Sequence, residues 1–317
     1  MTPESVSVLV LMGGPDAERE VSIMSGREVA EALRRAGRFD VIEQIIDTPT
    51  PSEISAMGGE IVFPVLHGRW GEGGPLQQVL EQAGAPYVGS GPEASALAMD
   101  KLKTKHLLAK DGMPTPPAQE LLPGDSHQLQ LPIVIKPIDD GSSVDLHICR
   151  NEAQVAAARQ SLHPKRGRLL AERYVKGREV TVGIVLSRAL PLIEIVPSEA
   201  VEFYDYQAKY FRDDTRYRLH PALPPGVNEQ CAKLALMAFG ALGCRDVARV
   251  DFMIDDAGPW FLELNTMPGF TTHSLVPMAA SEASMNMAAL CAALVDAALK
   301  RTELVSASAG ASGKRSI

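Results

Sequence analysis

A predicted β-hairpin over residues 249–269 holds the side chains best suited to chemistry. Residues 250–254 and 260–264 are apolar and β-prone, with one acidic residue inserted in each run. Residues 255–258 between them have the Asp-Asp-Ala-Gly composition of a turn. Carboxylates are costly to bury in strands this apolar unless a cation or a basic partner neutralises them. The pattern therefore indicates either a cation-binding site or an edge hairpin whose acids face water.

Side-chain alternation predicts which residues of this hairpin converge. Asp251 shares a face of the first strand with Met253. Glu263 shares a face of the second strand with Phe261 and Asn265. Folding of the hairpin would then bring Asp251, Glu263 and Asn265 together. Two carboxylates and an amide oxygen are hard ligands, so this set is suited to Mg²⁺.

The composition of the whole chain narrows the classes of function. Its 317 residues are enough for two domains or more, and its 45% apolar and 22% charged content is ordinary for a soluble globular protein. The net charge of −8 argues against a partner such as nucleic acid or a membrane surface, which would require a basic face. It does not exclude small anionic ligands, because these need only a few local cations.

The cysteines and the termini favour a cytoplasmic location. The four cysteines have no C-x-x-C spacing, so we expect buried free thiols in a reducing compartment. The N-terminus lacks the pattern of a signal peptide. No apolar run reaches the length of a transmembrane helix.

The N-terminal region, residues 1–100, is predicted to be a parallel α/β domain of Rossmann-like type. Residues 6–12, 41–46 and 61–66 are apolar runs typical of buried strands, and residues 22–37 have helical periodicity. Alternating strands and helices favour a parallel sheet with helices on both faces. Ligands of such sheets lie beyond the carboxyl ends of the strands.

Two loops at those strand ends carry candidate ligand-binding residues. One loop contains Gly13, Gly14 and Glu18, and the other begins at His67. The first loop does not match G-x-G-x-x-G, so it does not predict a dinucleotide site. Glu18 and His67 suit a small zwitterion, with the carboxylate facing its ammonium and the imidazole its carboxylate. The plainer alternative is that both side chains are simply solvated.

The middle region, residues 101–185, is predicted to be a small α+β lobe with phosphate-binding features. Residues 131–137 form a predicted strand that ends near Lys136, and a Gly- and Ser-containing loop over residues 138–144 follows. A lysine beside backbone N–H and hydroxyl groups is suited to phosphate, although the Walker A pattern is absent. Upstream, residues 100–111 form a basic helix.

The lysines of this basic helix, Lys101, Lys103 and Lys105, could equally be a solvated face. Residues 169–175 and 178–186 are predicted to pair as strands around a Lys-Gly turn. Glu172 and Glu179 would then lie on either side of the turn, where they could bind the amino and hydroxyl groups of a nucleotide. The alternative is a hairpin with surface glutamates.

The C-terminal region, residues 186–305, contains the opening hairpin and a long polar loop. Residues 203–217 are aromatic and charged without a clean period, which is typical of a functional surface loop. Lys209 and Tyr210 lie in its middle. Residues 285–300 predict a final helix, and residues 306–317 are expected to be a disordered tail because their composition turns to Ser, Ala, Gly and Lys.

Taken together, these motifs resemble the D-alanine–D-alanine ligases of the ATP-grasp superfamily over all but the tail. Eight stretches in family order carry the resemblance: GGPDAEREVS at 13–22, LHGRWGEGG at 66–74, DKLKTK at 100–105, IKPIDDGSS at 135–143, AERYVKGREVT at 171–181, YDYQAKY at 204–210, RVDFM at 249–253 and ELNTMPGFTTHSLVP at 263–277. The resemblance implies an ATP-grasp fold behind the N-terminal domain. It also implies ligation of two D-alanines through an acyl phosphate, for peptidoglycan precursors.

The resemblance further implies a set of nucleotide-binding and metal-binding residues. The residues for the ATP phosphates would be Lys101, Lys136, Gly141, Ser142 and Ser143. Glu172 and the backbone near Val175 would bind adenine, and Glu179 would bind the ribose. Asp251, Glu263 and Asn265 would hold two Mg²⁺ (or Mn²⁺) ions that bridge the phosphates.

A second set of implied residues serves the two D-alanines. Glu18 would bind the first ammonium, and His67 would lie near the first carboxylate. Arg249 and the backbone of Gly269 would stabilise the tetrahedral intermediate. The remaining implied residues are Ser274 and Lys209 for the second carboxylate, and Tyr210 and Ser142 in a hydrogen-bonded set with Glu18. A homodimer is also implied by resemblance alone.

The sequence departs from the family pattern at three places, and two other functions compete. Asp140 stands where the family more often has Glu, and residues 145–147 replace a small Gly-containing stretch. Met267 stands where the family commonly has Ser.

One alternative function is that of a ligase for D-lactate or D-serine, and the Lys209-Tyr210 pair argues against D-lactate. The other is a non-catalytic nucleotide-binding protein, which the presence of all three metal-binding side chains argues against.

Overall fold

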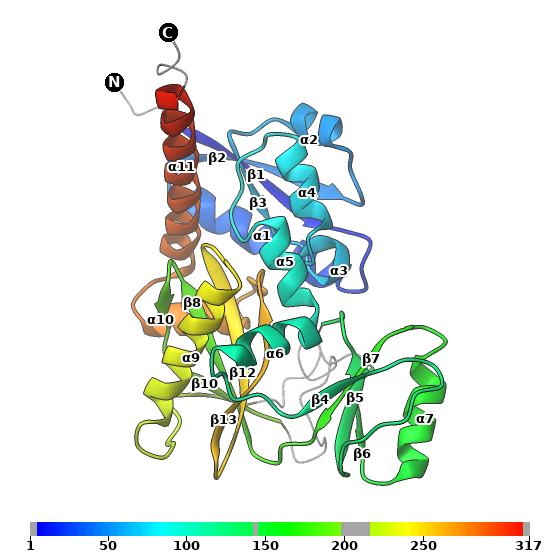
Figure 1. The fold of residues 1–317 in the computed structure, drawn as a ribbon. Helices are drawn as coiled ribbons and strands as arrows, with labels where there is room; N and C mark the ends of the chain where they lie inside the picture. The colour runs from blue at the N-terminus through cyan, green and yellow to red at the C-terminus, as the bar shows by residue number, and fades with distance from the viewer. Residues whose placement is uncertain (1–4, 142–144, 198–215, 313–317) are drawn as a thin grey trace.

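The computed structural model describes residues 5–141, 145–197 and 216–312, and Figure 1 shows their arrangement in three regions. The helices and strands, in chain order, are β1 (Val6–Gly13), α1 (Arg19–Arg35), β2 (Phe39–Ile46), α2 (Pro51–Met57), β3 (Ile61–Pro64), α3 (Gly68–Gly71), α4 (Pro75–Gln82), α5 (Pro92–Met99), α6 (Lys101–Lys110), β4 (Ala118–Leu121), β5 (Ile133–Pro137), β6 (His147–Cys149), α7 (Glu152–Leu162), β7 (Leu169–Arg173), β8 (Arg178–Val185), β9 (Arg188–Ala189), β10 (Ile193–Val196), β11 (Arg216–Leu219), α9 (Val227–Ala241), β12 (Val247–Asp255), β13 (Gly258–Asn265), α10 (Leu275–Glu282) and α11 (Met287–Ser312).

The N-terminal region is a parallel sheet with helices on both faces, as the sequence predicts. Its strands have the order β2-β1-β3, and both pairings are parallel. Val8 and Val10 of β1 pack in a core with α1 and α11, whereas Leu9 and Leu11 pack in a separate core with α2 and α4. Successive residues of β1 therefore face opposite layers.

The middle region is a small antiparallel sheet covered by one helix. Its strands have the order β4-β7-β5-β6. Ile133 and Ile135 of β5 pack against Val155 and Leu162 of α7 in a core of their own. This core is separate from those of the other regions, so the small sheet forms a distinct lobe.

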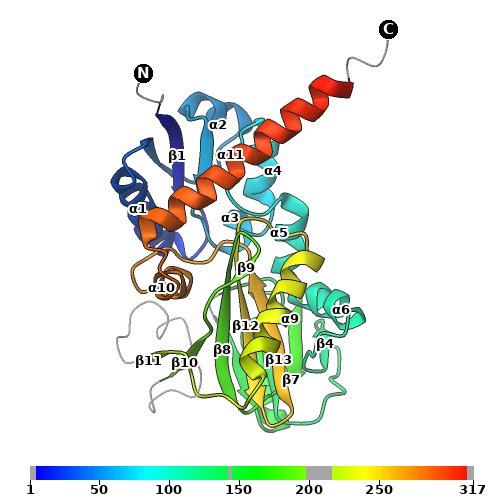
Figure 2. The same ribbon diagram turned by 90° about the vertical axis from the view of Figure 1, so that its left-hand side faces the viewer.

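The C-terminal region is built on a larger antiparallel sheet. Its strands have the order β11-β10-β8-β12-β13, and the short strand β9 pairs with β8. Figure 2 shows α9 against one face of this sheet, where Cys231 and Ala235 pack on Val250 and Phe252. The segment after β13 reaches back to the N-terminal sheet, since the rings of Phe270 and Phe63 pack edge to face at 5.5 Å.

The predicted pairing of residues 169–175 with residues 178–186 is wrong. Strand β7 hydrogen-bonds within the small sheet, and β8 hydrogen-bonds within the large sheet. The chain crosses between the lobes at Gly177, where a Cβ atom would lie 1.9 Å from the carbonyl oxygen of Ile254. Only glycine permits this close approach. We therefore propose that the lobe boundary lies at Lys176 and Gly177 rather than after residue 185.

The tail expected to be disordered, residues 306–317, lies partly outside the described residues. Helix α11 is described as far as Ser312, so it includes the first residues of this stretch. All four cysteines are buried free thiols, as predicted. No single helix in the described residues is long and apolar enough to cross a membrane. The bent pair of α10 and α11 reaches the required length and apolar composition only when the two helices are taken together.

Candidate active site

A pocket beyond the carboxyl ends of the parallel strands brings together side chains from distant parts of the chain. It is lined by Glu18, His67, Glu72, Gly141, Arg249, Asn265, Met267, Pro268 and Gly269. All of these except Glu72, Met267 and Pro268 are site residues that the sequence predicts. The N-terminal sheet, the small lobe and the large sheet all contribute, so the pocket exists only in the assembled fold.

Glu18 and His67 occupy the two strand-end loops that the sequence singles out. Glu18 is buried and directly precedes α1, whereas His67 is buried and directly follows the segment after β3. The Nδ1 atom of His67 lies 3.2 Å from the carbonyl oxygen of Met267. Burial lowers the pKa of His67, although the charge of Glu18 partly offsets this effect. The neutral ring therefore donates from Nδ1 to that carbonyl.

The other ring nitrogen of His67, Nε2, has a different environment. Nε2 is buried and has no hydrogen-bond partner among the described residues. A buried polar atom without a partner is costly, so a ligand that contacts Nε2 gains the interaction that the protein alone does not supply. This atom is the clearest mark of a binding site in the pocket.

The predicted metal-binding residues do converge on the hairpin of β12 and β13. Asp251 lies directly opposite Glu263 in the antiparallel register, and Asn265 lies opposite Arg249. The Nδ2 atom of Asn265 is 3.4 Å from a carboxylate oxygen of Asp251. Asp251 is buried, and it also accepts hydrogen bonds from Thr181 at 2.6 Å and from the Arg249 Nη2 at 2.8 Å.

The prediction that Phe261 shares a face with Glu263 is wrong because the hairpin is bulged. The register shifts so that Asp251 pairs with Glu263 but the next residue, Phe252, pairs with Phe261. Leu262 is the extra residue of this β-bulge. The rings of Phe252 and Phe261 pack edge to face in the core at 6.2 Å, while the acids face the site.

The donor chemistry of this set fits a hard divalent cation. No group of three or more His, Cys, Asp or Glu side chains in the described parts of the chain could hold a metal. The predicted set has two carboxylates and an amide instead, and its cross-strand pairing puts all three side chains on one face. Oxygen donors of this kind are preferred by Mg²⁺.

Two lysines of α6 are buried, contrary to a simple solvated face. Lys101 lies 3.2 Å from Glu263 and also donates to the carbonyl oxygen of Asp140. Lys105 is 1% exposed, whereas the side chain of Lys103 is 68% exposed. The helix therefore presents Lys101 and Lys105 to the site and Lys103 to solvent.

A buried charge cluster lies where the small lobe meets the large sheet. Glu172 of β7 is 2.5 Å from Lys136 of β5 and 3.0 Å from Lys105. Burial opposes ionisation of Glu172, but the two lysines outweigh it and lower its pKa to about 2. Lys105 also donates to the carbonyl oxygen of Phe261 at 2.9 Å. The half-buried Glu179 is near enough to favour the charged form of Lys136.

A second pocket, which contains Lys101 and Glu263, lies beside the first pocket. Its lining residues are Glu72, Ala98, Met99, Lys101, Asp140, Gly141, Glu263, Leu264, Asn265 and Thr266. Glu72, Gly141 and Asn265 line both pockets. The lysine and carboxylate side of the site is thus adjacent to the side that contains Glu18 and His67.

The remaining predicted residues lie partly inside and partly outside the described segments. Val175 is buried in the crossover between β7 and β8. Gly269 packs against Ser274, whose Oγ would be 2.8 Å from a Cβ atom at position 269 and which accepts a hydrogen bond from the Thr271 N–H. The predicted residues outside the described part of the chain are Ser142, Ser143, Lys209 and Tyr210.

Sequence reasoning missed Glu72, which lines both pockets. Its carboxylate is buried and is close to the backbone N–H groups of Gly68 and Met267, at 3.3 and 3.4 Å. Burial, reinforced by the charge of Glu18, raises the pKa of Glu72 to about 8. The available signal was an acid flanked by glycines directly after His67 and α3, in a stretch that already carried a candidate residue.

Comparisons with known proteins identify the family of the chain. The family model described as "D-ala D-ala ligase C-terminus" matches residues 107–296. The D-alanine–D-alanine ligase of Bordetella avium is 46% identical over 95% of this chain and 97% of its own length. The chain belongs to the D-alanine–D-alanine ligase family. The D-alanine–D-alanine ligase B of Chromobacterium violaceum is 45% identical over 91% of this chain and 96% of its own.

Solved structures of the same family share the fold. The Bacillus anthracis D-alanine–D-alanine ligase complexed with ATP has a TM-score of 0.81 and 28% identity, over 94% of this chain and 99% of that one. The Coxiella burnetii D-alanine–D-alanine ligase has a TM-score of 0.82 and 25% identity, over 96% of both chains. The mixed α/β architecture of this chain is therefore the architecture of D-alanine–D-alanine ligases.

Proposed function

We propose that this chain joins two D-alanine molecules at the expense of ATP, for peptidoglycan precursor synthesis. The γ-phosphoryl group passes to the carboxylate of the first D-alanine and yields D-alanyl phosphate and ADP. The amine of the second D-alanine then attacks the acyl carbon, and phosphate leaves to give D-alanyl-D-alanine. The observation that carries the proposal is the adjacency of the two pockets, which share Glu72, Gly141 and Asn265.

ATP would bind beside the cluster of lysines and Glu172 between the lobes. Lys101 and Lys136 would neutralise the phosphates, and Gly141 with Ser142 and Ser143 would cover them. In the described structure both lysines are paired with carboxylates, so they are held near the site before nucleotide arrives.

The nucleoside would lie between the two lobes beside this cluster. Glu172 and the backbone near Val175 would contact adenine, and Glu179 would contact the ribose hydroxyls. Adenine offers an amino group as a hydrogen-bond donor, and a carboxylate with a pKa of about 2 is a permanently charged acceptor for it.

The metal-binding face would align the phosphates. Asp251, Glu263 and Asn265 would hold two Mg²⁺ (or Mn²⁺) ions, which supply charge neutralisation to the transferring phosphoryl group when bound. The ion pairs of Asp251 with Arg249 and of Glu263 with Lys101 orient both carboxylates on the face that would bind the cations.

The first D-alanine would bind between Glu18 and His67. Its ammonium would face the Glu18 carboxylate, and its carboxylate would lie near Nε2 of His67, which has no partner in the described residues. Because Nδ1 of His67 is committed to the Met267 carbonyl, Nε2 donates to a carboxylate only when the ring is protonated. Binding of the anionic carboxylate would favour that protonation.

The second half-reaction would use the strand end beyond Asn265. Arg249 and the backbone N–H of Gly269 would stabilise the developing oxyanion, and one donor of this kind is typically worth ~3 kcal/mol of barrier. Ser274 and Lys209 would bind the second carboxylate. Tyr210, Ser142 and Glu18 would form the hydrogen-bonded set beside the attacking amine.

Product identity is the direct test of this function. The protein would be incubated with ATP, Mg²⁺ and a mixture of D-alanine, D-serine and D-lactate, and the products would be identified by mass. We expect D-alanyl-D-alanine with one phosphate released per dipeptide. A mixed product with D-lactate or D-serine would support the alternative substrate, and folded protein that releases no phosphate would defeat the ligase proposal.

The assembly and the location of the protein are inferred from the family resemblance and the substrates. We infer a homodimer, which sedimentation at several protein concentrations would test. We also infer a cytoplasmic location, because ATP and D-alanine are metabolites of that compartment.

A further inference from the structure

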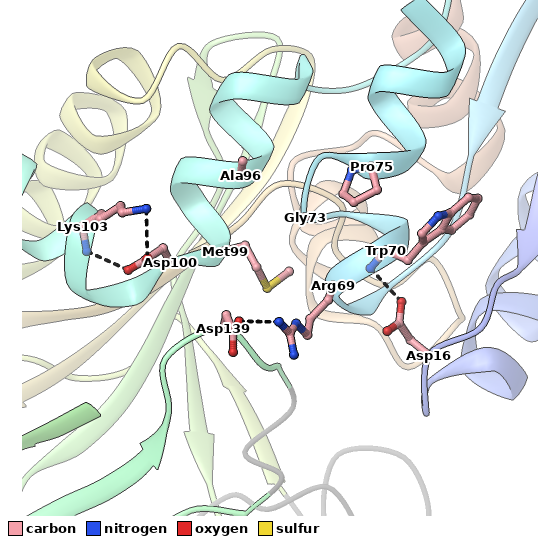
Figure 3. Close-up of a pocket in the computed structure, with 10 residues that line it drawn as sticks. All are labelled: Asp16, Arg69, Trp70, Gly73, Pro75, Ala96, Met99, Asp100, Lys103 and Asp139. Carbon is pink, nitrogen blue, oxygen red and sulfur yellow. Dashed lines mark hydrogen bonds and ion pairs between the residues drawn. The ribbon is translucent and has the colours of Figure 1, made fainter. Parts of the chain in front are cut away.

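An ion pair connects the N-terminal domain to the start of the small-lobe loop. The guanidinium Nη2 of Arg69 lies 2.8 Å from the Oδ2 atom of Asp139, as the dashed line in Figure 3 shows. Arg69 belongs to α3, the single turn that begins directly after His67. Asp139 comes three residues after Lys136. The pair therefore spans from the amino-acid side of the site to the phosphate side.

The segment that this pair holds, residues 138–141, lies over the amino-acid pocket. Gly141 lines the pocket with Glu18, and a Cβ atom at Gly141 would be 3.4 Å from the Glu18 Oε2. The neighbouring Asp140 is held by Arg166 through its carboxylate and by Lys101 through its carbonyl oxygen. Both acidic residues of the segment are thus paired with cations from different elements.

The N-terminal end of the ion pair is itself fixed to the loop that carries Glu18. The carboxylate of Asp16 accepts a hydrogen bond from the backbone N–H of Trp70 at 2.9 Å, also drawn in Figure 3. Asp16 and Glu18 lie in one short loop, and Arg69 and Trp70 are adjacent in α3. Displacement of residues 138–141 would therefore shift the groups that surround Glu18, because contacts connect them through Arg69, Trp70 and Asp16.

We propose that Arg69 is a positioning residue that holds residues 138–141 over the first D-alanine through Asp139. This inference rests on the proposed function. The pair itself lines a separate pocket with Asp16 and Trp70, and it acts on the site through Gly141, which lines both site pockets. Its loss lets the segment move away from Glu18, so the first D-alanine is retained less well and water reaches the acyl phosphate.

The size of the effect is set by the exposure of the pair. The side chains of Arg69 and Asp139 are 51% and 28% exposed, so solvent screens their attraction. Such a pair changes an equilibrium by about fivefold or less. We therefore expect a few-fold rise in the KM for the first D-alanine and a ratio of phosphate to dipeptide above that of the wild type, with a smaller change in kcat.

A double-mutant cycle isolates the pair from other effects of each residue. The variants are Arg69→Gln, Asp139→Asn and the double substitution, with Arg69→Lys as the conservative rescue. The control is another exposed Arg–Asp pair, Arg38 with Asp296, changed to Arg38→Gln. Phosphate and dipeptide are both quantified under initial-rate conditions, and thermal unfolding monitors the fold of every variant.

The outcomes distinguish a specific ion pair from a general loss of surface charge. We expect both single variants to raise the ratio of phosphate to dipeptide, the double variant to be no worse than either, and Arg69→Lys to recover most of the coupling. Additive single effects, an unchanged ratio, or the same change in Arg38→Gln would overturn the positioning role. A wild-type protein that forms no dipeptide would instead defeat the proposed function, so the two failures are distinguishable.

Discussion

Asp251 and Glu263 lie opposite each other across β12 and β13 because Leu262 is bulged out of the ladder. Without the bulge, the Phe261 ring and the Glu263 carboxylate would lie on the same face of the sheet. With it, Phe261 enters the core beside Phe252 and Glu263 faces Lys101. One extra residue thus separates an apolar face that stabilises the sheet from an acidic face that serves the proposed reaction.

The first prediction concerns the Glu263 carboxylate. Glu263→Gln keeps the shape of the side chain but removes the charge that would bind a cation, so we expect turnover to fall by ~100-fold or more, as for loss of one dominant electrostatic group. The control is Asp256→Asn, an exposed acid in the turn of the same hairpin. Turnover at saturating ATP and Mg²⁺ is measured for both. Unchanged turnover in Glu263→Gln would refute the metal assignment.

The second prediction concerns the buried Lys105. Lys105→Met removes one of the two cations that face Glu172 and also the donor to the Phe261 carbonyl. We expect a loss of ~3 kcal/mol in the free energy of unfolding, at the low end for breaking a buried pair, since Lys136 remains. ATP should also bind more weakly because Glu172 loses its orientation.

Lys103→Met, on the solvent-exposed face of α6, is the matched control for this change. Denaturant unfolding and nucleotide titration are run on both variants. Equal stabilities for the two variants would show that Lys105 does not hold the cluster together.

The third prediction is a pH dependence of stability that arises from Glu72. Its pKa rises from 4.5 to about 8 on folding, chiefly through burial, so the folded state binds the extra proton between these values. The stability that the protonated carboxyl contributes is therefore complete below pH 4.5 and is lost as the pH rises to about 8. The Glu72→Gln side chain has no such proton to lose, so the free energy of unfolding of this variant should fall less as the pH rises. At about 1.4 kcal/mol per pKa unit, the difference from the wild type amounts to as much as a few kcal/mol.

Unfolding free energies at several pH values, with the exposed Glu31→Gln as the control, test this assignment. We expect the Glu72→Gln variant to gain stability relative to the wild type as the pH rises. A parallel pH profile in the two proteins would mean that Glu72 does not titrate between folded and unfolded states.

Much of this molecule follows from local patterns, and the exceptions have one physical cause. Apolar runs and helical periodicity are local, so the parallel sheet, the helices on both its faces and the acidic hairpin are all predicted. The burial of Lys105 depends on Phe261, 156 residues away, and no local pattern encodes it. The same holds for β7 and β8, which are adjacent in sequence but pair with strands of different sheets.

The candidate site divides in the same way. Residue types and order point to Glu18, His67 and the three side chains proposed to bind metal. The partners that tune those groups are contributed by remote segments. Glu72 gains its high pKa from burial in the assembled pocket, and Asp139 forms an ion pair with Arg69, far away in sequence.

The last prediction follows from the two ring nitrogens of His67. Nδ1 contacts the Met267 carbonyl, and burial lowers the pKa of the ring below its usual 6.5, so the free protein holds a neutral imidazole near pH 7. Donation from Nε2 to the carboxylate of the first D-alanine requires protonation, and the bound carboxylate raises the pKa. Affinity for the first D-alanine should therefore be highest below the pKa of the free ring and fall as the pH increases.

Calorimetric titration of D-alanine in the presence of a non-hydrolysable ATP analogue measures this linkage directly. Titrations in two buffers with different ionisation enthalpies would show proton uptake on binding at neutral pH. His67→Gln donates an amide N–H at every pH, so this variant should bind with a flat pH profile and without proton uptake. Equal proton uptake by the wild type and His67→Gln would assign the proton to another group and remove His67 from the role of carboxylate donor.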